Sequence, residues 1–172
     1  MIFLDLDGVL ANFMLQVETY MTRYNLDHYK KPYWNWIDFE KATNTSIFDL
    51  LYPKLTRIEI LNFWATMPKY TWTHDLIKIM TPPMGKKDMR ILTAVTKRQS
   101  SFTEECVYGK RYWAAVNAPG IKVITCLREE KKNYATPKDT LVDDYNKNVA
   151  EFKEAGGKAY LFTNFENFKK GI

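Results

Sequence analysis

Residues 2–12 read Ile-Phe-Leu-Asp-Leu-Asp-Gly-Val-Leu-Ala-Asn and give the first indication of the architecture. The apolar residues that open this stretch predict a buried β-strand, which ends in two carboxylates, Asp5 and Asp7, followed directly by Gly8. Because aspartate is disfavoured inside strands, two of them at a strand end indicate a site rather than a core. Gly8 allows a sharp turn, and two carboxylates this close require a divalent cation or a shared proton. Taken alone, the stretch also fits a solvated Asp-Gly turn.

The size and composition of the chain are those of one globular domain. Its 172 residues leave room for a small insertion, and 46% hydrophobic with 26% charged residues is typical of a soluble protein. No run approaches the roughly 18 apolar residues of a membrane span. No basic leader precedes the first strand, so we expect no secretory signal and a cytoplasmic location. Cys106 and Cys126 lack the spacing of a zinc site, and we interpret them as buried reduced thiols.

The charge balance is moderately basic. The chain carries 25 Lys and Arg against 20 Asp and Glu, which gives a net charge of +5. This excess favours anionic partners in general. The lysines form separate pairs rather than a stripe, so the charge allows nucleic acid as a partner without favouring it, and we expect no membrane partner.

Strands alternate with helices along most of the chain. Apolar runs predict further strands at residues 89–92, 121–126, 139–142 and 159–162. Apolar side chains at three- and four-residue spacing predict helices at residues 9–24, 73–80, 102–117 and 149–155. The tail at 169–172 is expected to fray. This alternation predicts an α/β fold, a Rossmann-like parallel sheet of about five strands flanked by helices, with ligands beyond the carboxyl ends of the strands.

Residues 25–71 interrupt this alternation. They are rich in aromatic side chains, lack a strand pattern, and contain helical patterns at 38–42 and 57–65 separated by prolines. We expect a small helical cap at 25–71, inserted into an α/β core formed by residues 1–24 and 72–172. The aromatic rings of the cap could stack on a nucleobase or fill a small helical core, and the pattern leaves both open. The candidates for a substrate pocket are, in order of preference, Phe63, Trp64, Trp34 and Trp36.

Polar residues also follow two of the later strands. Thr93 stands at the end of the second strand, and the adjacent Asp143 and Asp144 stand at the end of the fourth. Adjacent side chains point apart on a strand, so one aspartate could bind a metal while the other holds the metal's waters. The alternative for the aspartates is a helix N-cap, for which one would suffice.

The string D-L-D-G-V-L-A, at residues 5–11, resembles the first motif, D-x-D-G-[TV], of the haloacid dehalogenase-like (HAD) phosphatases. The resemblance implies that Asp5 is the nucleophile that accepts the phosphoryl group and that Asp7 is the general acid and base. It also implies a Mg²⁺ ion held by the carboxylates of Asp5 and Asp143 and by the backbone carbonyl of Asp7. Asp144 would then hold the waters of the metal.

The resemblance extends to the residues that would bind phosphate. Thr93 stands where the family's second motif has a hydroxyl, which with the following backbone amide, that of Ala94, would hold a phosphoryl oxygen. The third motif is a lysine that neutralises the nucleophile and the transferring group. Lys131 matches the common spacing K-x-x-x-A and is preferred to Lys132, although composition does not separate the two.

Within this family the chain looks most like the 5'(3')-deoxyribonucleotidase branch. The resemblance rests on F-W at residues 63–64, on C-V-Y-G-K-R-Y-W around Lys110, and on D-D-Y-N-K-N-V at 143–149 with a downstream G-G. It implies that Lys110 helps to bind the substrate phosphate and that the substrate is a (deoxy)nucleoside monophosphate. The chain departs from the branch at T-A-V, residues 93–95, where the branch has a string like T-S-P, which puts base and sugar preference in doubt.

Three functions therefore compete. A nucleotide monophosphatase predicts turnover of free mononucleotides under a closed aromatic cap. A phosphatase acting on 3'-phosphate ends of nucleic acid, or on another small phosphate ester, predicts an open cleft approached by basic residues. A non-catalytic binding module is disfavoured because the nucleophile and the acid-base aspartate are both present.

Overall fold

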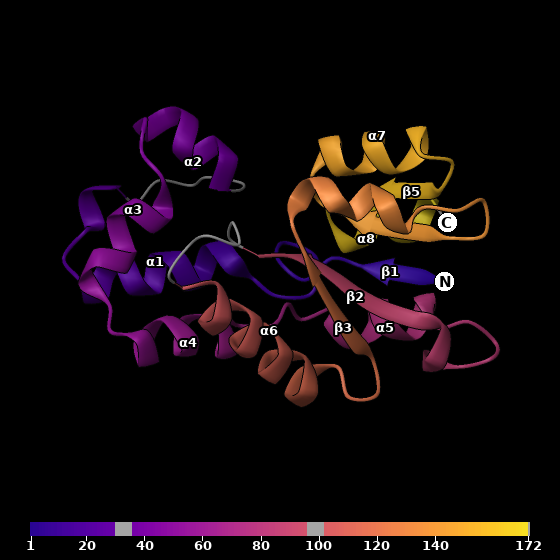
Figure 1. Cartoon of the computed structure of the whole chain (residues 1–172), viewed down its shortest axis with the longest axis horizontal. Helices are drawn as coiled ribbons and strands as arrows, with labels where there is room; N and C mark the ends of the chain where they lie inside the picture. The colour runs from indigo at the N-terminus through magenta and orange to yellow at the C-terminus, as the bar shows by residue number, and fades with distance from the viewer. Residues whose placement is uncertain (30–35, 96–101, 172) are drawn as a thin grey trace.

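The structure, a computed structural model, describes residues 1–29, 36–95 and 102–171, and of Trp36 and Ile37 only the backbone. Five parallel strands form one sheet in the order β3-β2-β1-β4-β5 (Figure 1). The α/β architecture predicted from the alternation is confirmed. The strands are β1 (Ile2–Leu4), β2 (Met89–Ala94), β3 (Lys122–Cys126), β4 (Thr140–Asp143) and β5 (Lys158–Leu161).

Helices cover both faces of this sheet and extend beyond one of its ends. The α-helices are α1 (Phe13–Arg23), α2 (Trp36–Thr43), α3 (Ile47–Leu51), α4 (Arg57–Ala65), α5 (Thr73–Met80), α6 (Thr103–Asn117), α7 (Asn146–Glu154) and α8 (Phe165–Gly171). The described residues also form the 3₁₀ turns η1 (Asp27–Tyr29), η2 (Tyr52–Lys54), η3 (Lys86–Asp88) and η4 (Arg128–Tyr134). Figure 1 shows α7 on one side of the sheet, α5 and α6 on the other, and α2 and α3 beyond the sheet.

The alternation of side chains along the strands fills two apolar layers. Phe3, Leu92 and Leu141 belong to the smaller layer, which α7 covers with Phe152. Leu4, which follows Phe3 on β1, points to the other face and belongs to the larger layer, together with side chains of α1, α5 and α6. The central strand β1 is therefore buried on both faces, as expected for a parallel sheet.

The cap and the α/β core share this larger layer. Leu51 and Phe63 from the cap lie in the same buried cluster as Leu4. Helix α4 packs closely on α6 because position 109 is glycine: a Cβ at Gly109 would lie 2.5 Å from the Cβ of Trp64. The cap is thus joined to the core by continuous packing. The boundaries between cap and core at residues 25 and 71 stay a prediction.

The chain before α1 and the chain that returns from the cap are hydrogen-bonded to each other. The Asn12 amide donates to the Pro68 carbonyl at 2.7 Å, and the Tyr70 amide donates to the Leu10 carbonyl at 3.2 Å. The Thr73 hydroxyl adds a bond of 2.7 Å to the same Leu10 carbonyl. The loop after Asp7 and the chain returning from the cap therefore run together.

Two expectations from the sequence need correction. The first helix begins at Phe13 instead of position 9, because residues 8–11 form a turn in which Gly8 donates to the Ala11 carbonyl and the Asn12 side chain then caps the helix. Residues 169–171 are helical instead of irregular, because α8 continues through Gly171 and buries Phe168 in the core, whereas Ile172 lies outside the described residues. In the part of the chain that the structure describes, no helix combines the length and apolar character needed to span a membrane.

Candidate active site

Three aspartates converge at the carboxyl ends of β1 and β4. These strands are hydrogen-bonded neighbours with Leu4 in register with Val142, so the residues that follow them lie side by side. Asp5, Asp143 and Asp144 each offer a carboxylate oxygen, and these oxygens lie within 4.8 Å of one another. Oxygen ligands of this kind suit Mg²⁺. The structure thus brings together acidic residues that are far apart in the sequence.

Gly8 makes room for one of these carboxylates. Its φ is +80°, a backbone conformation that glycine adopts without strain. A Cβ at position 8 would lie 2.0 Å from the Asp144 Oδ2 atom and 2.5 Å from the Asp144 Cγ atom. The glycine of the first motif therefore serves the turn and the close approach of Asp144 together.

Lys131 lies between two of the aspartates. Its ammonium is 2.9 Å from Asp5 Oδ1 and 2.7 Å from Asp143 Oδ2, and its side chain is 2% exposed. Burial lowers the pKa of Lys131, but the charges of Asp143 and Asp5 outweigh burial and hold it above its ordinary value. The neighbouring Lys132 is exposed. The structure thus settles which of the two lysines faces the carboxylates.

Asp143 and Asp144 lie in different surroundings. Asp143 is fully buried, and both of its oxygens accept hydrogen bonds, from Lys131, the Tyr145 amide and the Asn148 side chain. Asp144 accepts no hydrogen bond from the described residues. Loss of water around its carboxylate raises the pKa of Asp144 well above its ordinary value, and the charges of Asp5 and Asp143 add to this rise. Of the two, Asp144 is the carboxylate in need of a cation.

Burial also raises the pKa of Asp5, to about 7. Lys131 opposes this rise, whereas the carboxylates of Asp143 and Asp7 increase it. A carboxylate in these surroundings gains from any additional positive charge.

Asp7 lies on the other side of the turn, next to a second buried lysine. Its Oδ2 atom accepts a hydrogen bond from Lys110, while its Oδ1 atom is buried and has no partner among the described residues. The Lys110 ammonium also donates to the Thr93 hydroxyl at 3.0 Å and to the Ala94 carbonyl at 2.6 Å. The phosphate-binding candidates Thr93, Ala94 and Lys110 therefore form one cluster with Asp7.

The cap aromatics occupy a different position from the one predicted. Phe63 is 1% and Trp64 is 2% exposed, and both rings pack with Phe13 in the core. The interpretation of Phe63 and Trp64 as pocket walls is corrected to core packing, because neither ring has a free face for a base. Trp34 lies outside the described residues, as does the side chain of Trp36.

Two residues near the site were missed in the sequence. Asn148 fixes both oxygens of Asp143, and its place in α7 just after the paired aspartates is the signal that could have indicated it. Tyr70 is half-buried and stacks on Trp72, with ring centroids 4.3 Å apart. Burial and the nearby charges of Asp144 and Asp7 raise the pKa of Tyr70 to about 12. No spacing rule would have placed Tyr70 beside these acids.

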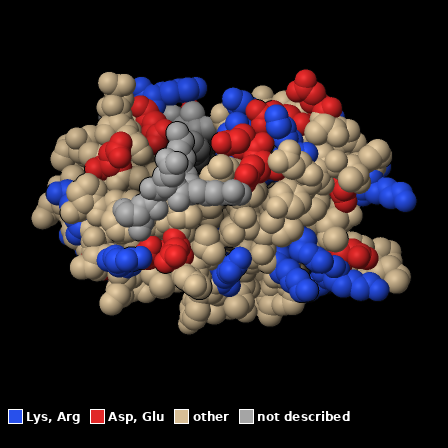
Figure 2. All heavy atoms as spheres, viewed as in Figure 1, with Lys and Arg blue, Asp and Glu red and all other residues tan. Residues whose placement is uncertain are grey.

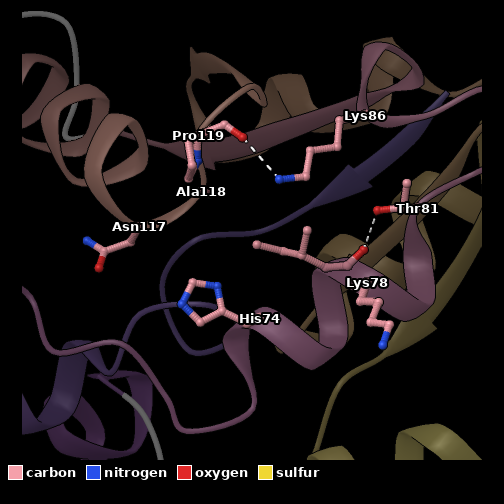
Figure 3. Close-up of a pocket in the computed structure, with 8 residues that line it drawn as sticks. His74, Lys78, Thr81, Lys86, Asn117, Ala118 and Pro119 are labelled. Atoms are coloured by element: carbon pink, nitrogen blue, oxygen red, sulfur yellow. Dashed lines mark hydrogen bonds between the residues drawn. The ribbon is translucent and has the colours of Figure 1, made fainter.

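A separate cavity of about 420 Å³ lies between α5 and the end of α6 (Figure 3). It is lined by cationic and neutral side chains, among them Lys78 and Lys86, and Lys86 donates to the Pro119 carbonyl at 3.1 Å. Both helices end at this cavity, and the negative ends of helix dipoles favour cations. Lys78 lies in the last turn of α5, where a cation is favoured.

Charged side chains of both signs are intermixed on the face that Figure 2 shows, and no continuous basic stripe crosses that face.

Comparisons with known proteins agree with this architecture. The family described as "5' nucleotidase, deoxy (Pyrimidine), cytosolic type C protein" matches residues 1–170. A hydrolase from Streptococcus pneumoniae has a similar structure, with a TM-score of 0.50 and 12% identity, over 99% of this chain and 96% of that one. A HAD-family enzyme from Bacteroides thetaiotaomicron, solved with magnesium and inorganic phosphate, gives a TM-score of 0.43 and 14% identity over 93% and 92% of the two chains. A search of curated proteins found no match.

The parallel sheet thus has the fold of the hydrolase from Streptococcus pneumoniae. Because the family match spans nearly the whole chain, the protein belongs to the cytosolic type C 5'-nucleotidase family and is an enzyme of the HAD-like phosphatase class.

Proposed function

We propose that the protein is a magnesium-dependent phosphomonoester hydrolase that converts (deoxy)nucleoside monophosphates to nucleosides and phosphate through an aspartyl-phosphate. The observation that carries the proposal is the convergence of Asp5, Asp143 and Asp144 within 4.8 Å, with Lys131 bridging two of them. The family description and its nucleotide substrates support the choice of ester.

The donor set fits a magnesium ion. Asp144 has no hydrogen-bond partner among the described residues and lies near Asp5, whereas Asp143 is committed to Lys131 and Asn148. We therefore propose Asp5, Asp144 and the backbone carbonyl of Asp7 as ligands, with Asp143 orienting Lys131. This reverses the roles that the resemblance implied for the paired aspartates. When bound, the ion would neutralise the anionic ester and the carboxylates around it.

The first half of the reaction uses Asp5 and Asp7. A carboxylate oxygen of Asp5 forms a bond to phosphorus in line with the ester oxygen, and the phosphorus–ester oxygen bond breaks. Asp7 gives its proton to the departing nucleoside oxygen. Lys131 lowers the charge repulsion between Asp5 and the ester, and the Thr93 hydroxyl with the Ala94 amide would bind phosphoryl oxygens.

The second half restores the enzyme. Asp7, now ionised, removes a proton from a water molecule, which attacks the phosphorus of the aspartyl-phosphate. The phosphorus–Asp5 oxygen bond breaks, inorganic phosphate leaves, and Asp7 again holds a proton. We assign these transfers to the carboxyl group of Asp7, whose side chain is 23% exposed.

Phosphate release from a panel of nucleoside monophosphates, with magnesium or with a chelator, tests the proposal. Asp5→Asn should remove turnover and leave the fold intact, while Asp75→Asn, at an exposed position on α5, serves as the matched control. A 3'-phosphorylated oligonucleotide included in the panel tests the alternative substrate. Full activity of Asp5→Asn would rule out its role as nucleophile.

A cytoplasmic location belongs to the same proposal. Cys106 and Cys126 are both buried thiols, which fits a reducing compartment. The word "cytosolic" in the family description supports it as well.

A further inference from the structure

The ammonium of Lys110 has no N–H left for a phosphate. A lysine ammonium has three N–H donors. Lys110 has three acceptors around it, namely Asp7 Oδ2, the Thr93 hydroxyl and the Ala94 carbonyl. Its side chain is 1% exposed, so water does not compete for these bonds. A phosphate could bind this ammonium only by displacing one of the three partners.

The packing of α6 on α4 holds Lys110 in this place. Gly109 lets the two helices approach until Trp64 lies over Lys110, with the ammonium 4.5 Å from the indole ring. Trp64 is itself fixed, because its Nε1 donates to the Tyr52 hydroxyl at 3.1 Å and its ring stacks on Phe13. A cation is attracted to the face of an indole ring, so the fixed ring of Trp64 favours one position of the Lys110 ammonium.

The charges keep Lys110 and Asp7 together. The Lys110 ammonium donates to Asp7 Oδ2, and the two side chains are 1% and 23% exposed. One oxygen of Asp7 is thus tied to a fixed cation, and the other is left without a partner. A carboxylate held in this way keeps one orientation relative to the end of β2.

We propose that Lys110 is a positioning residue that aims the Asp7 carboxylate, rather than a ligand of the substrate phosphate. It links the acid-base aspartate to the end of β2 through Thr93 and Ala94, and Trp64 of the cap fixes its ammonium. This inference rests on the proposed function, because it assigns to Asp7 the protonation of the leaving group.

The two roles predict different results for Lys110→Met and Lys110→Gln. A positioning residue acts on proton donation, which matters for a nucleoside leaving group and hardly for p-nitrophenol, a much more acidic alcohol. The kcat/KM value should therefore fall about 10²-fold for a nucleoside monophosphate and less than about 10-fold for p-nitrophenyl phosphate. The inhibition constant of inorganic phosphate should stay within about twofold of the wild-type value. The adjacent exposed Arg111→Met is the matched control for lost charge.

An equal fall for both esters with a raised phosphate inhibition constant would overturn the proposal and restore Lys110 as a phosphate ligand. Wild-type kinetics in both variants would overturn it as well. Thermal unfolding of each variant shows whether it is folded, and Lys110→Gln, which keeps two N–H donors, serves if Lys110→Met does not fold. If the wild-type protein releases phosphate from no ester, the proposed function fails. If calorimetry shows that the variants bind inorganic phosphate more weakly than the wild type, only the positioning role of Lys110 fails.

Discussion

The Asp144 carboxylate lies where a side chain at Gly8 would begin: Asp144 Oδ2 is 2.0 Å from the Cβ position of residue 8. Gly8→Ala should displace Asp144 and strain a backbone at φ +80°. We expect a loss of turnover of about 10²-fold, since displacements of about 1 Å have this effect in active sites. Steady-state kinetics check it, with Gly171→Ala, where a Cβ meets no neighbouring atom, as control. Unchanged activity in Gly8→Ala would contradict the close approach.

Removal of Lys131 should destabilise the protein strongly in the absence of a metal. Lys131→Met leaves Asp5 and Asp143 buried without their cation, and breaking such a pair costs about 3–5 kcal/mol. Urea unfolding measures the free energy of unfolding. The exposed Lys132→Met should change it little, and equal stabilities of the two variants would speak against the buried ion pairs.

Magnesium should raise the unfolding temperature, because an ion that binds only the folded protein stabilises the folded state. At a free magnesium concentration of a hundred times the Kd, the stabilisation is about 2.7 kcal/mol. Asp144→Asn should abolish most of this shift if Asp144 is the open ligand. Thermal unfolding over a magnesium titration provides the measurement, with Asp75→Asn as control. A full magnesium shift in Asp144→Asn would return the ligand role to Asp143.

The contact between cap and core should depend on Gly109. A Cβ there would lie 2.5 Å from the Trp64 Cβ and 2.7 Å from the Leu61 carbonyl oxygen, so Gly109→Ala must force α4 and α6 apart. Overpacking of this kind costs about 1–3 kcal/mol. Chemical denaturation gives the cost, and Gly171→Ala again is the reference. A variant as stable as the wild type would show that the two helices separate freely.

Stability at acid pH should depend in part on Glu59, which closes the capping box of α4 with Thr56 and accepts from the Tyr24 hydroxyl at 2.6 Å. The Tyr24 bond and the bonds from Thr56 lower the pKa of Glu59 to about 2. Because this value lies below the unfolded value of about 4.3, the contribution is present above pH 4.3 and is lost as the pH falls toward 2. The stability difference between wild type and Glu59→Gln should narrow over this window, as unfolding at a series of pH values would show. If the difference in the free energy of unfolding between wild type and Glu59→Gln stays constant over this pH range, Glu59 is not the source of the acid sensitivity.

Most of the fold could be predicted because a parallel sheet leaves a plain pattern. The strands are apolar runs, and polar residues occur where they end, so Asp5, Thr93 and Asp143 could be placed at one edge from the sequence. The exact start of α1 could not, because residues 8–11 form a turn before it, and the amide of Asn12, the residue that caps the helix, donates to the Pro68 carbonyl, which is distant in the chain.

The roles of individual side chains in the site were harder to predict. The sequence does not show which of the two adjacent aspartates accepts hydrogen bonds from Asn148. In the structure Asn148 donates to Asp143, and Asp144 accepts no hydrogen bond from the described residues. Aromatic content likewise does not distinguish a pocket wall from packing. Phe63 became a core residue because α4 turns it toward Phe13, a contact that depends on how the cap sits on α1.

We infer that a movement of the cap would be transmitted to Asp7. The amides of Asn12 and Tyr70 donate to the carbonyls of Pro68 and Leu10, so the loop that follows Asp7 is tied to the chain that returns from the cap. A swing of the cap would pull on this loop. Admission of a nucleotide and the orientation of the proposed proton donor would then depend on the same hydrogen bonds.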